Sequence, residues 1–72
     1  MAKTIYTKAH RNLVKQLIKA RKDAGLKQED VAKKLGRTQS YVSKIEAGQL
    51  RLDIVQIKEL SKIYKKNPKS FI

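Results

Sequence analysis

The side chains best suited to chemistry in this sequence lie in one short segment between two glycines, Gly36 and Gly48. The outward positions of that segment carry Gln39, Ser40, Tyr41, Ser43 and Lys44. The inward positions carry Val42 and Ile45, which are apolar. Amide, hydroxyl and ammonium groups donate and accept hydrogen bonds, and a row of them on the outside of a short helix is what reading base edges in a DNA groove requires. The segment therefore predicts recognition rather than catalysis.

An enzyme site is not indicated anywhere in the chain. There is one histidine, His10, and no cysteine, and no spacing brings a nucleophile, a base and an orienting acid together. We expect His10 at the surface, and a single imidazole cannot form a metal site without further ligands. The lack of cysteine excludes disulfides and fits a reducing cytoplasm. We therefore predict no enzyme activity, no metal and no cofactor.

The chain is strongly basic. Lys and Arg total 18 against 6 Asp and Glu, which gives a net charge of +12 at pH 7 and an isoelectric point of about 10.3. Such a charge favours polyanions such as DNA, RNA or an acidic membrane, although charge alone also fits a surface that is merely solvated. The sequence shows no signal peptide and no run approaching the ~20 apolar residues of a membrane span. We expect a soluble, cytoplasmic protein.

Helical periodicity and capping residues divide the chain into an arm, residues 1–6, and one domain, residues 7–72. The predicted helices cover about residues 7–24, 28–35, 38–47 and 53–64, with a last turn at 67–71. Thr38 and Asp53 are the predicted N-caps of the third and fourth helices. The expected inward side chains are Leu13, Leu17, Ala20, Ala24, Val31, Ala32, Leu35, Val42, Ile45, Ile54, Ile57, Leu60, Tyr64 and Phe71. No strand pattern appears, so the predicted class is all-α.

The second and third predicted helices have the residue types of a helix-turn-helix. A steep crossing of two helices demands a small residue at their contact and a residue that tolerates positive φ in the turn. Ala32 and Gly36 meet these two demands, and apolar residues line both inner faces. The predicted motif spans residues 28–47, and its second helix covers about residues 39–47.

At this level of detail the run QEDVAKKLGRTQSYVSKIEAG, with GL before it and RLDIVQIKEL after it, closely resembles the phage repressor and Cro-like, or XRE, helix-turn-helix family. The resemblance covers about residues 13–72. It implies a compact five-helix bundle of the lambda-repressor-like type, in which the third helix enters the major groove and the second crosses the backbone. It further implies a sequence-specific regulator of transcription that binds double-stranded DNA, with repression as the expected output.

The resemblance also assigns roles to individual residues. Gln39 falls where family members have the first base reader, and glutamine suits paired hydrogen bonds to adenine N6 and N7. The implied base-contacting residues are Gln39, Ser40, Ser43 and Lys44. The implied phosphate-contacting or positioning residues are Gln28, Thr38, Arg37, Tyr41, Arg21, Gln49 and Arg51. For Tyr41, packing against a neighbouring helix is as well supported as a DNA contact. For Arg37, Gln49 and Arg51, a solvated surface position is as well supported as a phosphate contact.

Three further features accompany these assignments. Arg21 and Glu46 occupy positions that commonly form an ion pair between the first and third helices of the family. Lys27 stands where a capping Ser, Thr or Asn is frequent, so the second helix is expected to start without a side-chain acceptor. Arg37 replaces a small apolar residue and adds a cation beside the third helix.

The family resemblance implies a homodimer on a palindromic operator, with half-sites about one helical turn, ~34 Å, apart. The apolar candidates for the dimer interface are Leu50, Val55, Phe71 and Ile72, each of which fits the core of a monomer equally well.

The alternative function is the antitoxin half of a toxin–antitoxin pair, which binds a protein toxin and its own operator. RNA binding is disfavoured because few aromatic side chains are available for stacking, and membrane binding because the apolar face of the first helix is needed for the core.

Overall fold

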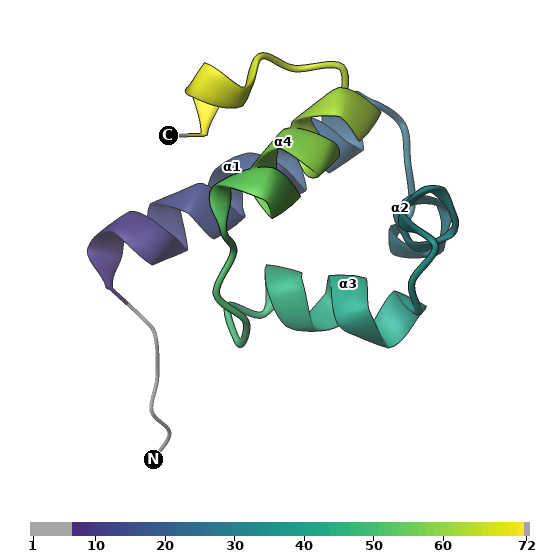
Figure 1. Cartoon of the computed structure of the whole chain (residues 1–72), viewed down its shortest axis with the longest axis horizontal. Helices are drawn as coiled ribbons and strands as arrows, with labels where there is room; N and C mark the ends of the chain where they lie inside the picture. Colours follow the sequence, from purple (N-terminus) through teal and green to yellow (C-terminus); the bar gives the residue numbers. More distant parts are fainter. Residues whose placement is uncertain (1–6, 72) are drawn as a thin grey trace.

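The structure is a computed structural model that describes residues 7–71, which form four α-helices and one short 3-10 turn (Figure 1). The elements are α1 (Lys8–Asp23), α2 (Gln28–Leu35), α3 (Gln39–Glu46), α4 (Ile54–Ile63) and η1 (Pro68–Ser70). No strand occurs among these residues, so the predicted all-α class is confirmed. The predicted arm, residues 1–6, and Ile72 lie outside the described residues.

Polar side chains fix where three of the helices begin. Thr7, Thr38 and Asp53 each accept a hydrogen bond from the backbone N–H three residues further on, at 3.0, 3.2 and 2.8 Å. At α4 the Gln56 side chain also accepts a bond from the Asp53 backbone N–H at 2.9 Å, which completes a capping box. These local bonds satisfy N–H groups that have no partner inside a helix, and they explain why the predicted starts agree with the observed ones.

The start of α2 confirms one expectation and adds a bond that was not predicted. Lys27 supplies no side-chain acceptor, as predicted, but the Asp30 carboxylate accepts a hydrogen bond from the Lys27 backbone N–H at 2.9 Å. A capping box has two bonds, one accepted by the side chain of the N-cap residue and one accepted by the side chain of the third helical residue. Here only the second bond, to the Asp30 side chain, is present. The helix start is therefore held by a residue that the sequence analysis did not assign to it.

The predicted count of five helices is also corrected. The fifth element is the three-residue turn η1, in which Asn67 accepts a bond from the Lys69 N–H at 2.9 Å and Pro68 occupies the first position. This turn ends at its C-cap Phe71, which is buried at 9% exposure. Since Phe71 belongs to the core, it is removed from the candidates for a dimer interface.

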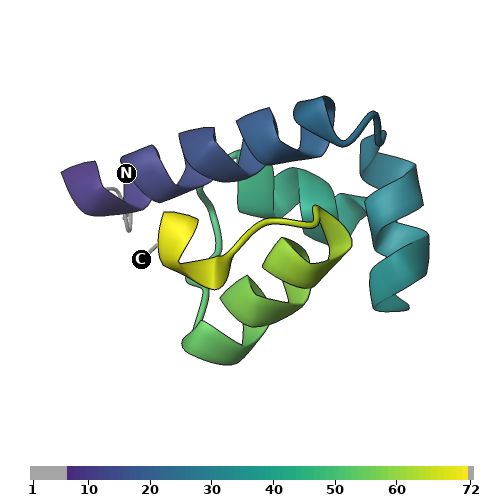
Figure 2. The same ribbon diagram turned by 90° about the horizontal axis from the view of Figure 1, so that it is seen from above.

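The core lies among the four α-helices: in Figure 2, α1 runs along one side, α4 and η1 along the other, α2 closes one end and α3 lies behind. Its buried side chains are Leu17, Ala20, Val31, Ala32, Val42, Ile45, Ile57, Leu60, Tyr64 and Phe71. Of the residues expected inside, Leu13 and Leu35 are partly buried, and two others are exposed. Ala24 is exposed because it is the C-cap of α1, and Ile54 is 47% exposed because it begins α4 at the margin of the packed helices. Within the described residues, no helix combines the length and apolarity needed to cross a membrane.

The helices α2 and α3 cross steeply, since α2 is seen nearly end-on in the view in which α3 lies across the page (Figure 1). Ala32 is buried at 3% exposure, and Gly36 after it has a φ of 70°. A residue with a side chain rarely adopts that conformation. The predicted small contact residue and turn glycine are thus both where the motif requires them.

One helix ends on a strained residue. At the end of each α-helix, two consecutive residues donate backbone bonds to carbonyl groups of the last turn, and the first of these two has positive φ. That residue is Gly25, Gly36 and Gly48 after α1, α2 and α3, whereas it is Lys65 after α4, with φ of 58°. A left-handed conformation costs a residue with a Cβ about 1–2 kcal/mol. The chain therefore carries conformational strain at Lys65.

Lys65→Gly is expected to raise the free energy of unfolding by about 0.5 kcal/mol, because relief of strain exceeds the entropy that glycine adds to the unfolded chain. In a domain of this size the melting temperature would rise by about 2–4 °C, measured by circular dichroism. Lys66→Gly is the matched control, since it removes the same charge without relieving positive φ. An equal rise in both variants would attribute the effect to charge repulsion instead of strain.

Candidate nucleic-acid interface

The helix α3 has one apolar and one polar side. Val42 and Ile45 are 1% and 3% exposed and hold the helix against the core. The opposite side is exposed and carries Gln39, Ser40, Ser43 and Lys44. These four residues, which the sequence analysis assigned to base contacts, thus share one solvent-facing surface on a helix at the margin of the molecule (Figure 1). We call this surface the α3 face. It offers an amide, two hydroxyls and an ammonium group, the donors and acceptors that base edges and phosphates pair with.

Tyr41 joins α3 to α4. It is half-buried, and its hydroxyl accepts a hydrogen bond from Gln56 Nε2 at 2.7 Å. The Arg37 guanidinium lies over the Tyr41 ring, with Cζ 3.9 Å from the ring centroid, a cation–π contact. Tyr41 therefore packs between helices, and the hydroxyl retains its own proton as a donor. This contact was not predicted, because Gln56 lies 15 residues from Tyr41 and no local signal connects the two.

A network of hydrogen bonds behind the α3 face joins three helices. Arg21 of α1 donates from Nε to Glu46 Oε2 at 2.7 Å and from Nη2 to Oε1 at 3.2 Å. Gln28 of α2 donates from Nε2 to the same Oε1 at 2.9 Å. Arg21 Nη1 also donates to the carbonyl oxygen of Leu26 at 2.9 Å. The expected pair between Arg21 and Glu46 is therefore present, and it is bidentate.

Burial makes this network stiffer than a surface ion pair. The Arg21 and Glu46 side chains are only 13% and 7% exposed, so water screens their attraction weakly and the charged hydrogen bonds have fixed geometry. Glu46 is the last residue of α3, Arg21 belongs to α1, and Gln28 is the first residue of α2. The network therefore fixes the end of α3 relative to the two helices packed against it.

Tyr64, at the end of α4, lies within the field of this ion pair. Its side chain is 3% exposed. Burial, and secondarily the negative charge of Glu46, raise the pKa of Tyr64 to about 12 from 10.0, while the positive charge of Arg21 opposes the rise. The phenol is therefore neutral at physiological pH and adds no charge to the network.

The raised pKa of Tyr64 predicts a loss of stability at alkaline pH. Because the unfolded state releases the phenol proton first, the contribution is fully present below pH 10 and is lost as the pH rises through about 12. The total loss is expected to be roughly 2 kcal/mol. Urea unfolding of the wild type and of Tyr64→Phe across this range measures it, because the variant lacks the ionising group. Parallel losses in the two proteins would show that other groups cause the decline.

Two predicted contacts lie away from the α3 face. Gln49 and Arg51 are exposed in the loop between α3 and α4, and Arg51 lines a hollow with Thr7, His10 and Leu52 near the start of α1. His10 corrects an expectation, because it is half-buried and its Nε2 is inaccessible, with no hydrogen-bond partner within residues 7–71. The loop that carries Arg51 packs beside α1, a contact between segments that are far apart in the sequence.

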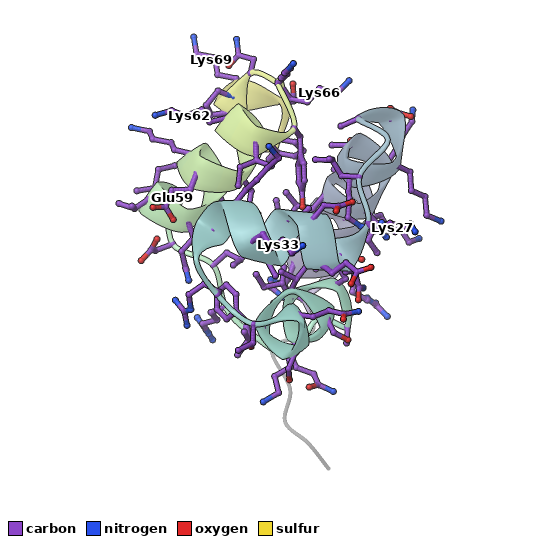
Figure 3. The ribbon with its side chains drawn as sticks, turned by 90° about the vertical axis from the view of Figure 1, so that its right-hand side faces the viewer. Lys27, Lys33, Glu59, Lys62, Lys66 and Lys69 are labelled. Atoms are coloured by element: carbon purple, nitrogen blue, oxygen red, sulfur yellow. The ribbon has the colours of Figure 1, made fainter. Side chains whose placement is uncertain are left out.

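Positive charge surrounds the motif. The helix α2 packs on α3 and presents Lys33 to solvent, and Lys27 is exposed at its start (Figure 3). Arg37 in the turn between α2 and α3 and Lys44 on α3 add further cations, in a molecule that carries a net charge of +12. Such a surface attracts phosphate. In the part of the chain that the structure describes, no three His, Asp or Glu side chains come together as metal ligands.

Comparison with known proteins assigns this arrangement to a family. Residues 17–71, which contain the later turns of α1 and all of α2, α3, α4 and η1, match the family model described as helix-turn-helix. A comparison with curated proteins gives no match. Because the family model covers more than half of the chain and includes the steep α2–α3 crossing with its exposed polar face, the chain belongs to the helix-turn-helix family of Cro and repressor-like DNA-binding domains, which regulate transcription.

Proposed function

We propose that this protein is a sequence-specific repressor that binds duplex DNA with α3 in the major groove. The observation that carries the proposal is the α3 face. It is exposed to solvent, and the Arg21–Glu46–Gln28 network fixes the end of α3 relative to α1 and α2. Base readout requires donors and acceptors in a fixed register, which a helix anchored at both ends provides. Gln39 reads adenine, and Ser40, Ser43 and Lys44 read the neighbouring bases or phosphates. Its place of action is then inside the cell.

Phosphate contacts supply most of the affinity in this proposal. The residues that make them or position the motif are Gln28, Thr38, Arg37, Tyr41, Arg21, Gln49 and Arg51. Arg37 is the best supported of these, because it is exposed, it stacks on Tyr41, and its fork of donors remains available to a phosphate beside α3.

Arg37→Gln is expected to lower the slope of log K against log salt concentration by about 1, the value for one lost phosphate contact. Fluorescence anisotropy with one short duplex, repeated at several salt concentrations, measures the slope. Lys58→Gln is the control, since Lys58 is exposed on α4 and belongs to neither the motif nor its neighbouring loops. Identical slopes for Arg37→Gln and the wild type would assign Arg37 to the solvated surface.

Homodimerisation on a palindromic operator is part of the proposal. Among the original candidates Val55 is 60% exposed and Leu50 is half-buried against the core, and Ile54 beside Val55 adds a second exposed apolar side chain. Adjacent exposed apolar residues favour a protein contact. The same pair of residues also favours the alternative function, an antitoxin, in which a toxin covers them instead of a second copy.

The decisive experiment is selection of binding sites from a random duplex pool at ~150 mM salt. An enriched palindrome supports a dimeric, sequence-specific regulator, and a single enriched half-site supports a monomeric one. The absence of any enriched sequence would contradict specific recognition by α3. Placing the enriched site within a promoter that drives a reporter then distinguishes repression from activation.

A further inference from the structure

A second basic surface lies at the end of the molecule opposite α3. We call it the C-terminal lysine surface, and its residues are Lys62, Lys65, Lys66 and Lys69. All four are exposed. Both the front view and the side view place the end of α4 and η1 at the top and α3 at the bottom, with Lys62, Lys66 and Lys69 projecting outward (Figures 1 and 3). A straight duplex held against α3 therefore lies on the other side of the domain.

The charge of this surface is not neutralised by the protein. Between Leu60 and Phe71 the chain has four lysines and no acidic residue. Lys19 of α1 and Lys34 of α2 line hollows next to Lys66, and Asp23 is the acidic residue that these hollows share. Within residues 7–71, none of the four lysines forms a salt bridge. Unpaired ammonium groups this close together favour a polyanion over solvent.

The backbone gives an independent reason to regard the charge as functional. Lys65 occupies the left-handed position after α4, where the other three helices have glycine. A lysine there is conformationally unfavourable compared with glycine. Folding alone would thus prefer glycine at this position, and the lysine contributes a positive charge to a surface that already has three.

The chemistry of the surface identifies its partner as the backbone of double-stranded nucleic acid. Single strands are bound through exposed aromatic rings, but the two rings nearest to this surface, Tyr64 and Phe71, are buried. Stable protein interfaces are centred on buried anchor side chains, and helices that lie in a membrane surface insert an apolar face. The large apolar side chains that are exposed among residues 7–71, Ile54 and Val55, lie at the opposite end of α4. Ammonium groups that lie outside a base-reading helix bind backbone phosphates whatever the base sequence of the duplex is.

We propose that the C-terminal lysine surface binds the phosphate backbone of a second DNA duplex, so that one domain bridges two DNA segments. The inference rests on the proposed function, since the α3 face holds the first duplex. Binding of the second duplex is independent of sequence and strongly dependent on salt. The domain measures 32 × 25 × 20 Å, so the bridged duplexes are separated by one small domain.

A two-duplex capture assay tests this proposal. A duplex carrying the selected site is immobilised and saturated with protein, and a labelled duplex of unrelated sequence is then added. The triple variant Lys62→Gln, Lys66→Gln, Lys69→Gln is expected to occupy the first duplex normally and to capture the second at least about tenfold less. The slope of log K against log salt for the second duplex is expected to fall by about 2.7, or 0.9 for each lost phosphate contact.

Two further variants separate the lysine surface from total charge and from folding. The control triple Lys8→Gln, Arg11→Gln, Lys15→Gln removes the same charge from exposed positions early in α1 and is expected to retain capture. Lys65→Gly is expected to capture less of the second duplex while its melting temperature stays the same or rises, which loss of folding cannot produce.

The outcomes are distinguishable. Failure of the wild type to occupy the first duplex would contradict the proposed function, whereas occupancy of the first duplex without capture of the second would overturn bridging alone. Full capture by the lysine triple variant would also overturn it, because the second duplex would then be held by the α3 face of another copy. An equal loss of capture in both triple variants would assign binding to net charge and not to this surface.

Discussion

Glu46→Ala is expected to destabilise the domain by about 3 kcal/mol. The substitution removes the acceptor of three hydrogen bonds, two from Arg21 and one from Gln28. It leaves Arg21, whose side chain is only 13% exposed in the intact network, with the Leu26 carbonyl as its remaining partner. An uncompensated buried charge is costly, and removing one partner of a buried pair typically costs about 3–5 kcal/mol. Because Arg21 keeps some access to water, the lower end of that range applies. Urea unfolding followed by circular dichroism measures the loss.

A matched control and a rescue variant test the cause of this loss. Glu59→Ala makes the same change at an exposed position of α4 (Figure 3) and is expected to alter stability by less than about 0.5 kcal/mol. The double variant Arg21→Met, Glu46→Leu removes both charges and is expected to recover much of the loss, because no buried charge is left unpaired. If Glu46→Ala and Glu59→Ala had equal effects, the network would be no stronger than a surface ion pair.

Gln39→Ala is expected to cost about 1–3 kcal/mol of binding free energy on the selected site, which is a 5- to 150-fold rise in Kd. The reason is the position of Gln39 as the first residue of α3, exposed on the α3 face and without a structural partner among the described hydrogen bonds. Removing its amide leaves a base edge unpaired but does not disturb the core. The preference for one base at a single position of the site is expected to weaken, which selection of binding sites with the variant would reveal.

The control for this substitution is Gln16→Ala, which makes the same change at an exposed position of α1. It is expected to leave both affinity and sequence preference unchanged. A loss in Gln39→Ala that is the same on the selected site and on random DNA would show that Gln39 contributes a general contact and reads no base. Melting temperatures of both variants confirm that folding is intact.

The positions of the helices were predictable because their signals are local. Thr7, Thr38 and Asp53 each bond a backbone N–H only three residues away, and positive φ is confined to single residues after the helices. Such interactions form between neighbours whatever the rest of the chain does. The count of helices failed only at the last element, because the capping signal at Asn67 marks where a turn begins and not how long it continues.

The candidate site was predictable only in part. The α3 face follows from the helical period, and the burial of Val42 and Ile45 bears out which side is inward. The ion pair of Arg21 with Glu46 came from the family resemblance, because nothing local connects residues 25 apart. The contact of Gln56 with Tyr41 across 15 residues and the coverage of His10 were missed for the same reason.

By itself, then, the sequence determined the helix starts, the inward and outward sides of α3, and the positive charge that favours DNA. The tertiary structure alone decided that Ile54 and Val55 remain exposed, and that the four lysines near the C-terminus lie opposite α3. The physical reason is that capping and periodicity act over one helical turn, whereas burial and the relative placement of charged surfaces depend on which distant segments pack together.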